Sequence, residues 1–137
     1  MMTILKWIKV KSNLSHTAQF QNQAASLSFH AHTPGHIVIN EQTYTQPVLC
    51  QQDRILMPQA PNIQQINLNQ LKQWQQTYQP ELILIGTGTQ SCTIPKTIES
   101  FCHSHQVAVE AMSTNLCIRT LVALQGELRA LICLLTP

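Results

Sequence analysis

The sequence predicts a mixed α/β domain, with strands packed on one side and helices on another. Residues 82–85 form a continuous apolar run, which is typical of a strand covered on both faces. The strands of the second half are separated by helices of about ten residues, which favours β-α-β units and a mainly parallel sheet. Short strands joined by turns between residues 29 and 57 add an antiparallel component.

The chain has 137 residues, which suits one domain with its own core. Residues 1–28 are a weakly patterned segment, and residues 29–137 carry the domain. In the first half of the domain, Pro34-Gly35 and Asn40-Glu41 predict turns, and Pro58 and Pro61 end the strand-rich part. The expected strands cover residues 36–39, 42–44, 48–50 and 54–57.

The first predicted helix covers residues 70–78 and is capped by Asn67 or Asn69, while Pro80 stops it. Its apolar face follows the i, i+3, i+7 spacing of a helix. That face consists of Leu71, Trp74 and Tyr78.

A second helix begins at Pro95, and the strand at residues 107–109 follows it. The inner face of this second helix is expected to carry Ile98, Phe101, Cys102 and His105. The third helix covers residues 116–124, with Ser113 or Asn115 as its cap and Gly126 as its stop. Residues 128–135 form the final strand.

The net charge is only +2, and charged residues make up 10% of the chain, well below the roughly 25% that is usual. Amide side chains, mainly glutamine, take the place of charged ones, so long-range electrostatic steering should be weak. Lys6, Lys9 and Lys11 form the only basic cluster, which is a solvated terminus, a membrane-surface contact or a weak organelle-targeting signal. Because no basic stripe interleaves with aromatic residues, we expect no nucleic-acid binding.

We expect the protein to reside in a reducing compartment such as the cytoplasm. Lys6 interrupts the apolar start, so no signal peptide is visible, and no apolar run is long enough to cross a membrane. The cysteine count is odd and the spacing irregular, which favours free thiols. The cysteines are Cys50, Cys92, Cys102, Cys117 and Cys133.

Two loops that follow successive strands carry the candidate site, since such loops emerge at the same edge of a parallel sheet. The expected ligand-binding residues are Gly86, Thr87, Gly88, Met112, Ser113, Thr114, Arg119 and Thr120. The glycines either expose backbone N–H groups to an anion or supply tight backbone geometry. A phosphate-loop lysine is missing after Gly88, and Ser91 stands where a dinucleotide fingerprint has its third glycine.

Arg119 interrupts an apolar stretch, so its side chain must reach solvent or find a partner. It either binds an anionic group, with Thr87, Thr114 and Thr120 as hydroxyl partners, or pairs structurally with Glu110.

We expect no metal, cofactor or catalytic set. His30, His32 and His36 lack a nearby cysteine or carboxylate that would complete a metal site, so they fit a solvated loop. Cys92 and Cys117 have no histidine neighbour in sequence to activate a nucleophile.

Several segments resemble one small single-domain family in their order and spacing. These are residues 80–88, Ile94-Pro95, residues 107–112 and Arg119-Thr120, with Pro34-Gly35, residues 37–39 and Tyr44 upstream. The family includes the mitochondrial complex I (NADH dehydrogenase) assembly factor 3, the adipogenesis-associated protein and uncharacterised prokaryotic members. The resemblance implies a three-layer β/β/α fold with a mixed central sheet and an N-terminal antiparallel hairpin region.

For function, the resemblance implies a non-enzymatic interaction domain, with a role in assembling a respiratory or membrane complex, mitochondrial in a eukaryote. The partner would be a protein, and the sequence does not define the oligomeric state. The alternative is a small anionic-ligand protein or enzyme with its site between residues 86–89 and 112–120. The family usually has Met-Asp-Thr in its second loop and Tyr-Asn after the Arg-Thr pair. In this chain Ser113 replaces the aspartate, and Leu121 and Val122 replace the tyrosine and the asparagine.

Overall fold

The computed structural model describes residues 26–90, 92–127 and 130–137. The weakly patterned segment lies almost wholly outside the described residues, as do its lysines Lys6, Lys9 and Lys11. Among the described residues, no helix is both long and apolar enough to cross a bilayer.

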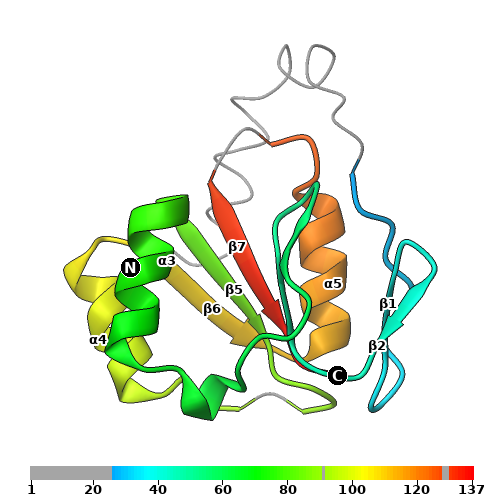
Figure 1. The fold of residues 1–137 in the computed structure, drawn as a ribbon, viewed down its shortest axis with the longest axis horizontal. Helices are drawn as coiled ribbons and strands as arrows, with labels where there is room; N and C mark the ends of the chain where they lie inside the picture. The colour runs from blue at the N-terminus through cyan, green and yellow to red at the C-terminus, as the bar shows by residue number, and fades with distance from the viewer. Residues whose placement is uncertain (1–25, 91, 128–129) are drawn as a thin grey trace.

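A five-stranded mixed sheet forms the centre of the domain, with strand order β4-β3-β7-β5-β6 (Figure 1). Its strands are β3 (Val48–Cys50), β4 (Ile55–Met57), β5 (Leu82–Gly86), β6 (Ala108–Met112) and β7 (Leu131–Leu135). Strand β5 runs parallel to both β6 and β7, whereas β3 is antiparallel to β4 and β7. The last strand of the chain therefore joins the parallel and antiparallel parts.

A separate antiparallel ribbon is formed by β1 (Ile37–Ile39) and β2 (Gln42–Tyr44). Its turn residues Asn40 and Glu41 have φ values of 50° and 67°. Positive φ at both central positions is the geometry of a type I′ turn, whose twist matches that of paired strands. The predicted N-terminal hairpin is thus confirmed.

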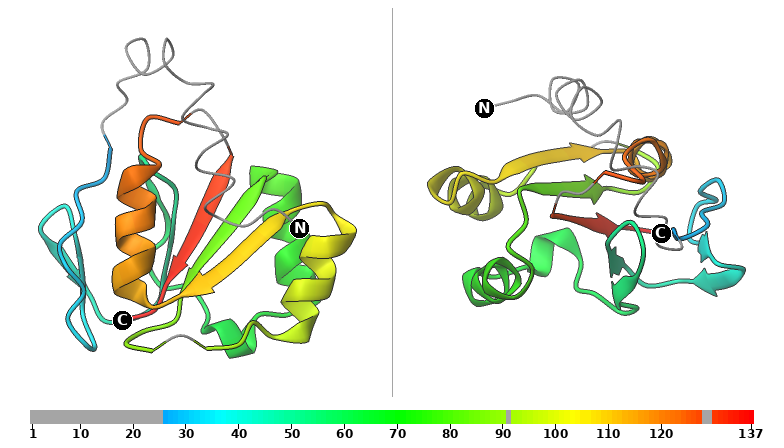
Figure 2. Two further views of the ribbon diagram at one scale, coloured as in Figure 1. Left: turned by 180° about the vertical axis from the view of Figure 1, so that it is seen from behind. Right: turned by 90° about the horizontal axis from the view of Figure 1, so that it is seen from above.

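Three helices of the described chain cover the two faces of the sheet (Figure 2). They are α3 (Leu68–Tyr78), α4 (Lys96–Ser104) and α5 (Thr114–Ala123). Helices α3 and α4 pack on one face, and α5 packs on the other together with the β1–β2 ribbon. The predicted mixed α/β domain is confirmed by this arrangement.

Strand β5 shows why its sequence is continuously apolar. Leu82 and Leu84 belong to the core beneath α5 and the ribbon, whereas Ile83 and Ile85 belong to the core beneath α3 and α4. All four side chains are at most 5% exposed. A strand with both faces covered cannot accept alternating polar residues, so the apolar run identifies the middle of the sheet.

One local prediction is wrong, and the structure adds detail to others. Strands β3 and β4 belong to the central sheet, because β3 pairs with β7, and a short 3-10 helix (Ile63–Gln65) lies in the connection after β4. His105 is exposed at the end of α4 and stacks on the ring of Phe101 at 4.0 Å. The prediction that this side chain lies on the buried face of the helix is wrong, because α4 ends one residue earlier, at Ser104. The described part of the last strand begins at Leu131.

We predict that Asn67→Ala lowers the free energy of unfolding by about 1 kcal/mol, whereas Asn69→Ala changes it little. The Asn67 side-chain oxygen accepts a hydrogen bond from the Gln70 backbone N–H at 2.9 Å and caps α3. Asn69 is exposed within the first turn and serves as the matched control. Urea unfolding of the two variants measures the difference, and equal losses would show that the cap contributes nothing.

Candidate functional site

The two loops meet at the carboxyl edge of the sheet, as expected for loops that follow adjacent parallel strands. Gly86 at the end of β5 lies opposite Met112 at the end of β6. The Thr87 backbone N–H donates to the Met112 carbonyl at 2.8 Å, and the Thr87 hydroxyl donates to the Gln90 carbonyl at 2.6 Å. The bond between Thr87 and Met112 thus fixes segments 25 residues apart in sequence against each other.

Thr114 ties three chain segments together at this edge. Its hydroxyl accepts a hydrogen bond from the Gly88 N–H at 2.8 Å and donates one to the Thr136 carbonyl at 2.6 Å. Its own N–H donates to the Gly88 carbonyl at 2.8 Å. The side chain is completely buried, so these bonds supply partners that water cannot provide.

Gly86 is required by the close approach of α5 to the end of β5. A Cβ atom there would lie 3.0 Å from both Cα and Oγ1 of Thr114, and 3.2 Å from Cβ of Cys117. Gly88 has room for a side chain but a φ of +96°, which an L-residue adopts only with strain. Each glycine therefore serves a different geometric need.

Three backbone N–H groups that could have faced an anion already have partners. The N–H groups of Thr87, Gly88 and Thr114 all donate hydrogen bonds within the contact between the loops that follow β5 and β6, which we call the loop joint. An anion-binding loop needs such groups to point outward. The geometry thus matches the tight-backbone interpretation of the glycines.

The other candidate residues lie around the start of α5 and differ in exposure. Ser113 caps the helix, its hydroxyl accepting from the Leu116 N–H at 3.3 Å, and Met112 is buried. Thr120 donates its hydroxyl to the Leu116 carbonyl at 2.9 Å. Arg119 is exposed on the outer side of α5.

His32 and Asn115 form a contact that the sequence did not reveal. The Asn115 side-chain oxygen accepts from the His32 N–H at 2.9 Å, across 83 positions of sequence. Burial lowers the pKa of His32, and the neighbouring Pro137 backbone acts in the opposite direction. Nε2 of the ring is buried with no hydrogen-bond partner. Asn115 therefore holds the segment before β1 against α5, while Ser113 caps the helix.

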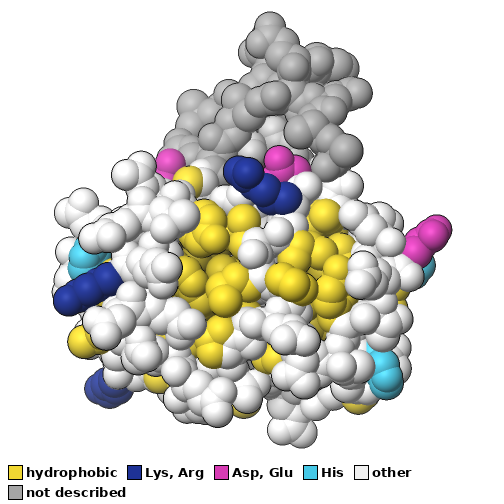
Figure 3. Space-filling model, viewed as in Figure 1, with side chains coloured by type: hydrophobic (Ala, Val, Ile, Leu, Met, Phe, Trp, Pro, Cys, Tyr) yellow, Lys and Arg dark blue, Asp and Glu magenta, His cyan; other side chains and the backbone are white. Residues whose placement is uncertain are grey.

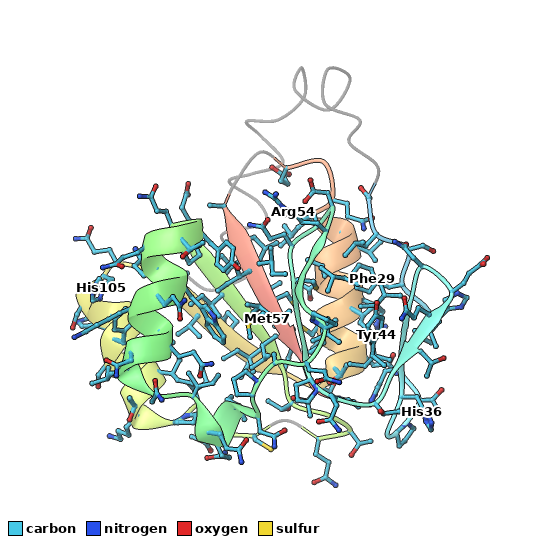
Figure 4. All side chains as sticks on the ribbon, viewed as in Figure 1. Phe29, His36, Tyr44, Arg54, Met57 and His105 are labelled. Atoms are coloured by element: carbon cyan, nitrogen blue, oxygen red, sulfur yellow. The ribbon has the colours of Figure 1, made fainter. Side chains whose placement is uncertain are left out.

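The remaining histidines and thiols fall in separate places. His30 and His36 are exposed. Figure 4 shows His36 near the β1–β2 ribbon, far from His105 on the α4 side. Among the described residues, no group of three or more His, Cys, Asp or Glu side chains is arranged to hold a metal ion. Cys92 is exposed, whereas Cys102 is buried, and burial raises its pKa to about 11.

These features define a small mixed α/β domain with a closed loop joint at the carboxyl edge of its sheet. The chain belongs to the family described as protein of unknown function (DUF498/DUF598), which matches residues 29–136. A search of curated proteins found no match.

Solved structures with the same fold come from several bacteria. A Bordetella parapertussis protein is 23% identical with a TM-score of 0.69, over 85% of this chain and 99% of that one. An outer membrane protein from Bartonella henselae is 20% identical with a TM-score of 0.65, over 82% and 96% of the two chains. A Bordetella pertussis protein, described as a Mth938-like domain, is 19% identical with a TM-score of 0.65, over 85% and 88%. At these identities the likeness establishes the fold.

We predict that Thr114→Val lowers the free energy of unfolding by about 2–4 kcal/mol. Valine keeps the shape but removes both hydrogen bonds, leaving the buried Gly88 N–H without its acceptor. Thr114→Ser keeps the hydroxyl and should cost about 1 kcal/mol for the lost methyl group. Chemical denaturation compares them, and a valine variant as stable as the serine variant would show that the bonds add nothing.

We also predict that His32 makes stability fall as the pH drops through about 6.5, the ordinary pKa of histidine. Because burial lowers the pKa in the folded state, protonation favours the unfolded chain; the contribution is therefore present above 6.5 and lost below it. Urea unfolding between pH 7.5 and pH 5 measures this for the wild type and His32→Gln. The exposed His30→Gln is the control, and an unchanged pH slope in His32→Gln would contradict the prediction.

Proposed function

We propose that this chain is a non-enzymatic protein-interaction domain that contacts its partner through the outer face of α5. The observation that carries this proposal is the placement of Arg119 between two exposed apolar side chains. Leu116 and Val122 are each 46% exposed, which is high for large apolar residues of a folded domain. Their positions on the helix, at i−3 and i+3 from Arg119, put all three on one outward-facing surface.

This combination is typical of the centre of a protein interface. Arginine is enriched at energetically important interface positions, where neighbouring apolar contacts exclude water from its hydrogen bonds. Because the chain has few charges, recognition would depend on contact more than on long-range attraction. Figure 3 views the opposite face of the molecule, which carries α3; hydrophobic side chains gather at its centre and charged ones lie at its edges.

The finer proposal is a role in assembling a respiratory or membrane complex. It rests on the resemblance to the family of the mitochondrial complex I assembly factor 3, and would place the protein in the cytoplasm, or in mitochondria in a eukaryote. The joint formed by Gly86, Gly88 and Thr114 supports such a role, because it holds the start of α5 rigidly. A rigid helix loses little conformational entropy when a partner binds.

A second candidate function is binding of a small anionic ligand beside the loop joint. It is favoured by the exposed side chain of Arg119, which can reach an anion in solvent. Thr120 lies one position further along α5. In this proposal Arg119 binds a carboxylate or phosphate from the solvent side, without the three backbone N–H groups used inside the joint.

We predict that Arg119→Ala reduces partner capture by about tenfold or more, as expected for an arginine at the centre of an interface. Affinity capture from the native organism with the full chain as bait, quantified by mass spectrometry, measures this. Lys72→Ala removes one positive charge from the exposed side of α3 and should leave capture unchanged. Equal capture by both variants, or repeated capture of no specific protein, would overturn the interaction proposal.

The ligand proposal has its own test. A panel of carboxylate and phosphate compounds should raise the midpoint of thermal unfolding of the wild type, because a ligand that binds only the folded state stabilises it. Arg119→Ala should abolish the shift, and Lys72→Ala should keep it. A panel without one stabilising compound would exclude this second function while leaving the capture experiment unaffected.

A further inference from the structure

A cluster of three thiols lies between the central sheet and α5. Cys50 of β3 and Cys133 of β7 stand directly opposite in their antiparallel pairing, and Cys117 of α5 lies above them. All three side chains are completely buried. The Cys117 and Cys133 sulfur atoms are 3.4 Å apart.

We propose that Cys117 and Cys133 form a redox-sensitive pair, whose oxidation to a disulfide links α5 covalently to the middle strand of the sheet. A disulfide needs the sulfur atoms at about 2.05 Å, so they must approach by little more than 1 Å.

The surroundings of Cys133 make its thiol slow to react. Burial, together with the neighbouring thiols of Cys117 and Cys50, raises its pKa and keeps it protonated. Hydrogen peroxide, a small oxidant, converts one thiol of the pair to the sulfenic acid with release of water. The other thiol loses its proton and attacks that sulfur as the thiolate, a second water leaves, and the S–S bond forms with two electrons transferred to peroxide in total.

The burial of the pair sets the rate. A solvent oxidant reaches Cys117 only when α5 lifts from the sheet, so oxidation reports on that opening. Cys117 also lies directly under the loop joint, where its Cβ limits the space at Gly86. The cross-link would therefore fix the start of the helix that carries Arg119, although its formation does not depend on any partner of that face.

The experiment uses the full chain carrying Cys92→Ser, so that the exposed thiol cannot form adducts. The protein is treated with peroxide while its circular dichroism stays native, then alkylated and mapped by mass spectrometry. We expect a peptide linked through Cys117 and Cys133, reversed by dithiothreitol, with Cys50 and Cys102 still alkylated. Buried Cys102 belongs to the other core and is an internal control for oxidation without a neighbouring thiol.

Three outcomes would overturn the proposal. The first is a link through Cys50 and Cys133 instead, and the second is a link that appears only after the chain has unfolded. The third is no link under peroxide that fully oxidises Cys92 in the wild-type chain. Cys117→Ser, with similar size but no thiol, must abolish the link. If the link pins α5 as proposed, the oxidised protein unfolds at higher urea concentration than the reduced protein, and an unchanged midpoint would contradict that step.

Discussion

The hydroxyl group of Thr114 is the contact on which the carboxyl edge of the molecule depends. It is completely buried and joins the loop after β5, the start of α5 and the residue after β7. Because all three segments leave the sheet at the same edge, each would otherwise end with backbone groups cut off from water. One side chain that both accepts and donates satisfies two of those groups at once. Helix α5 then begins so close to β5 that only glycine fits at position 86.

The same closeness explains what the candidate site residues do. Gly86, Gly88 and Thr114 turn inward and hold the joint, whereas Arg119 projects from the next turn of α5 into solvent. Sequence position alone placed all of them together, because residues that follow adjacent parallel strands do meet. Sequence position could not show which of these residues form hydrogen bonds with each other. That distinction needs the positions of donors and acceptors, which depend on how closely the two loops approach.

Local patterns predicted the elements well, and long-range pairing was the part they could not supply. The apolar run of β5, the Asn67 cap of α3 and the turn at Asn40-Glu41 are each encoded by neighbouring residues, and all three are present. The pairing of β7 with β3 joins segments more than 80 residues apart, and no short-range signal specifies it. For the same reason Asn115 could be read as a helix cap, although its actual partner is His32. Short apolar strands such as β3 fit either a separate hairpin or the central sheet until their neighbours are known.

The positions where this chain departs from the family it resembles acquire separate physical meanings in the fold. Serine at position 113 still caps α5, as an aspartate would, but it brings no negative charge to that end of the helix. Leu121 is completely buried on the inner face of α5, so an apolar residue there adds to the core. Val122 is exposed and places an apolar group beside Arg119, while Ser113 and Leu121 leave the joint that positions the arginine undisturbed. An arginine in such surroundings is less well hydrated and gains more from a desolvated contact, which is the physical basis for assigning the outer face of α5 to a protein partner.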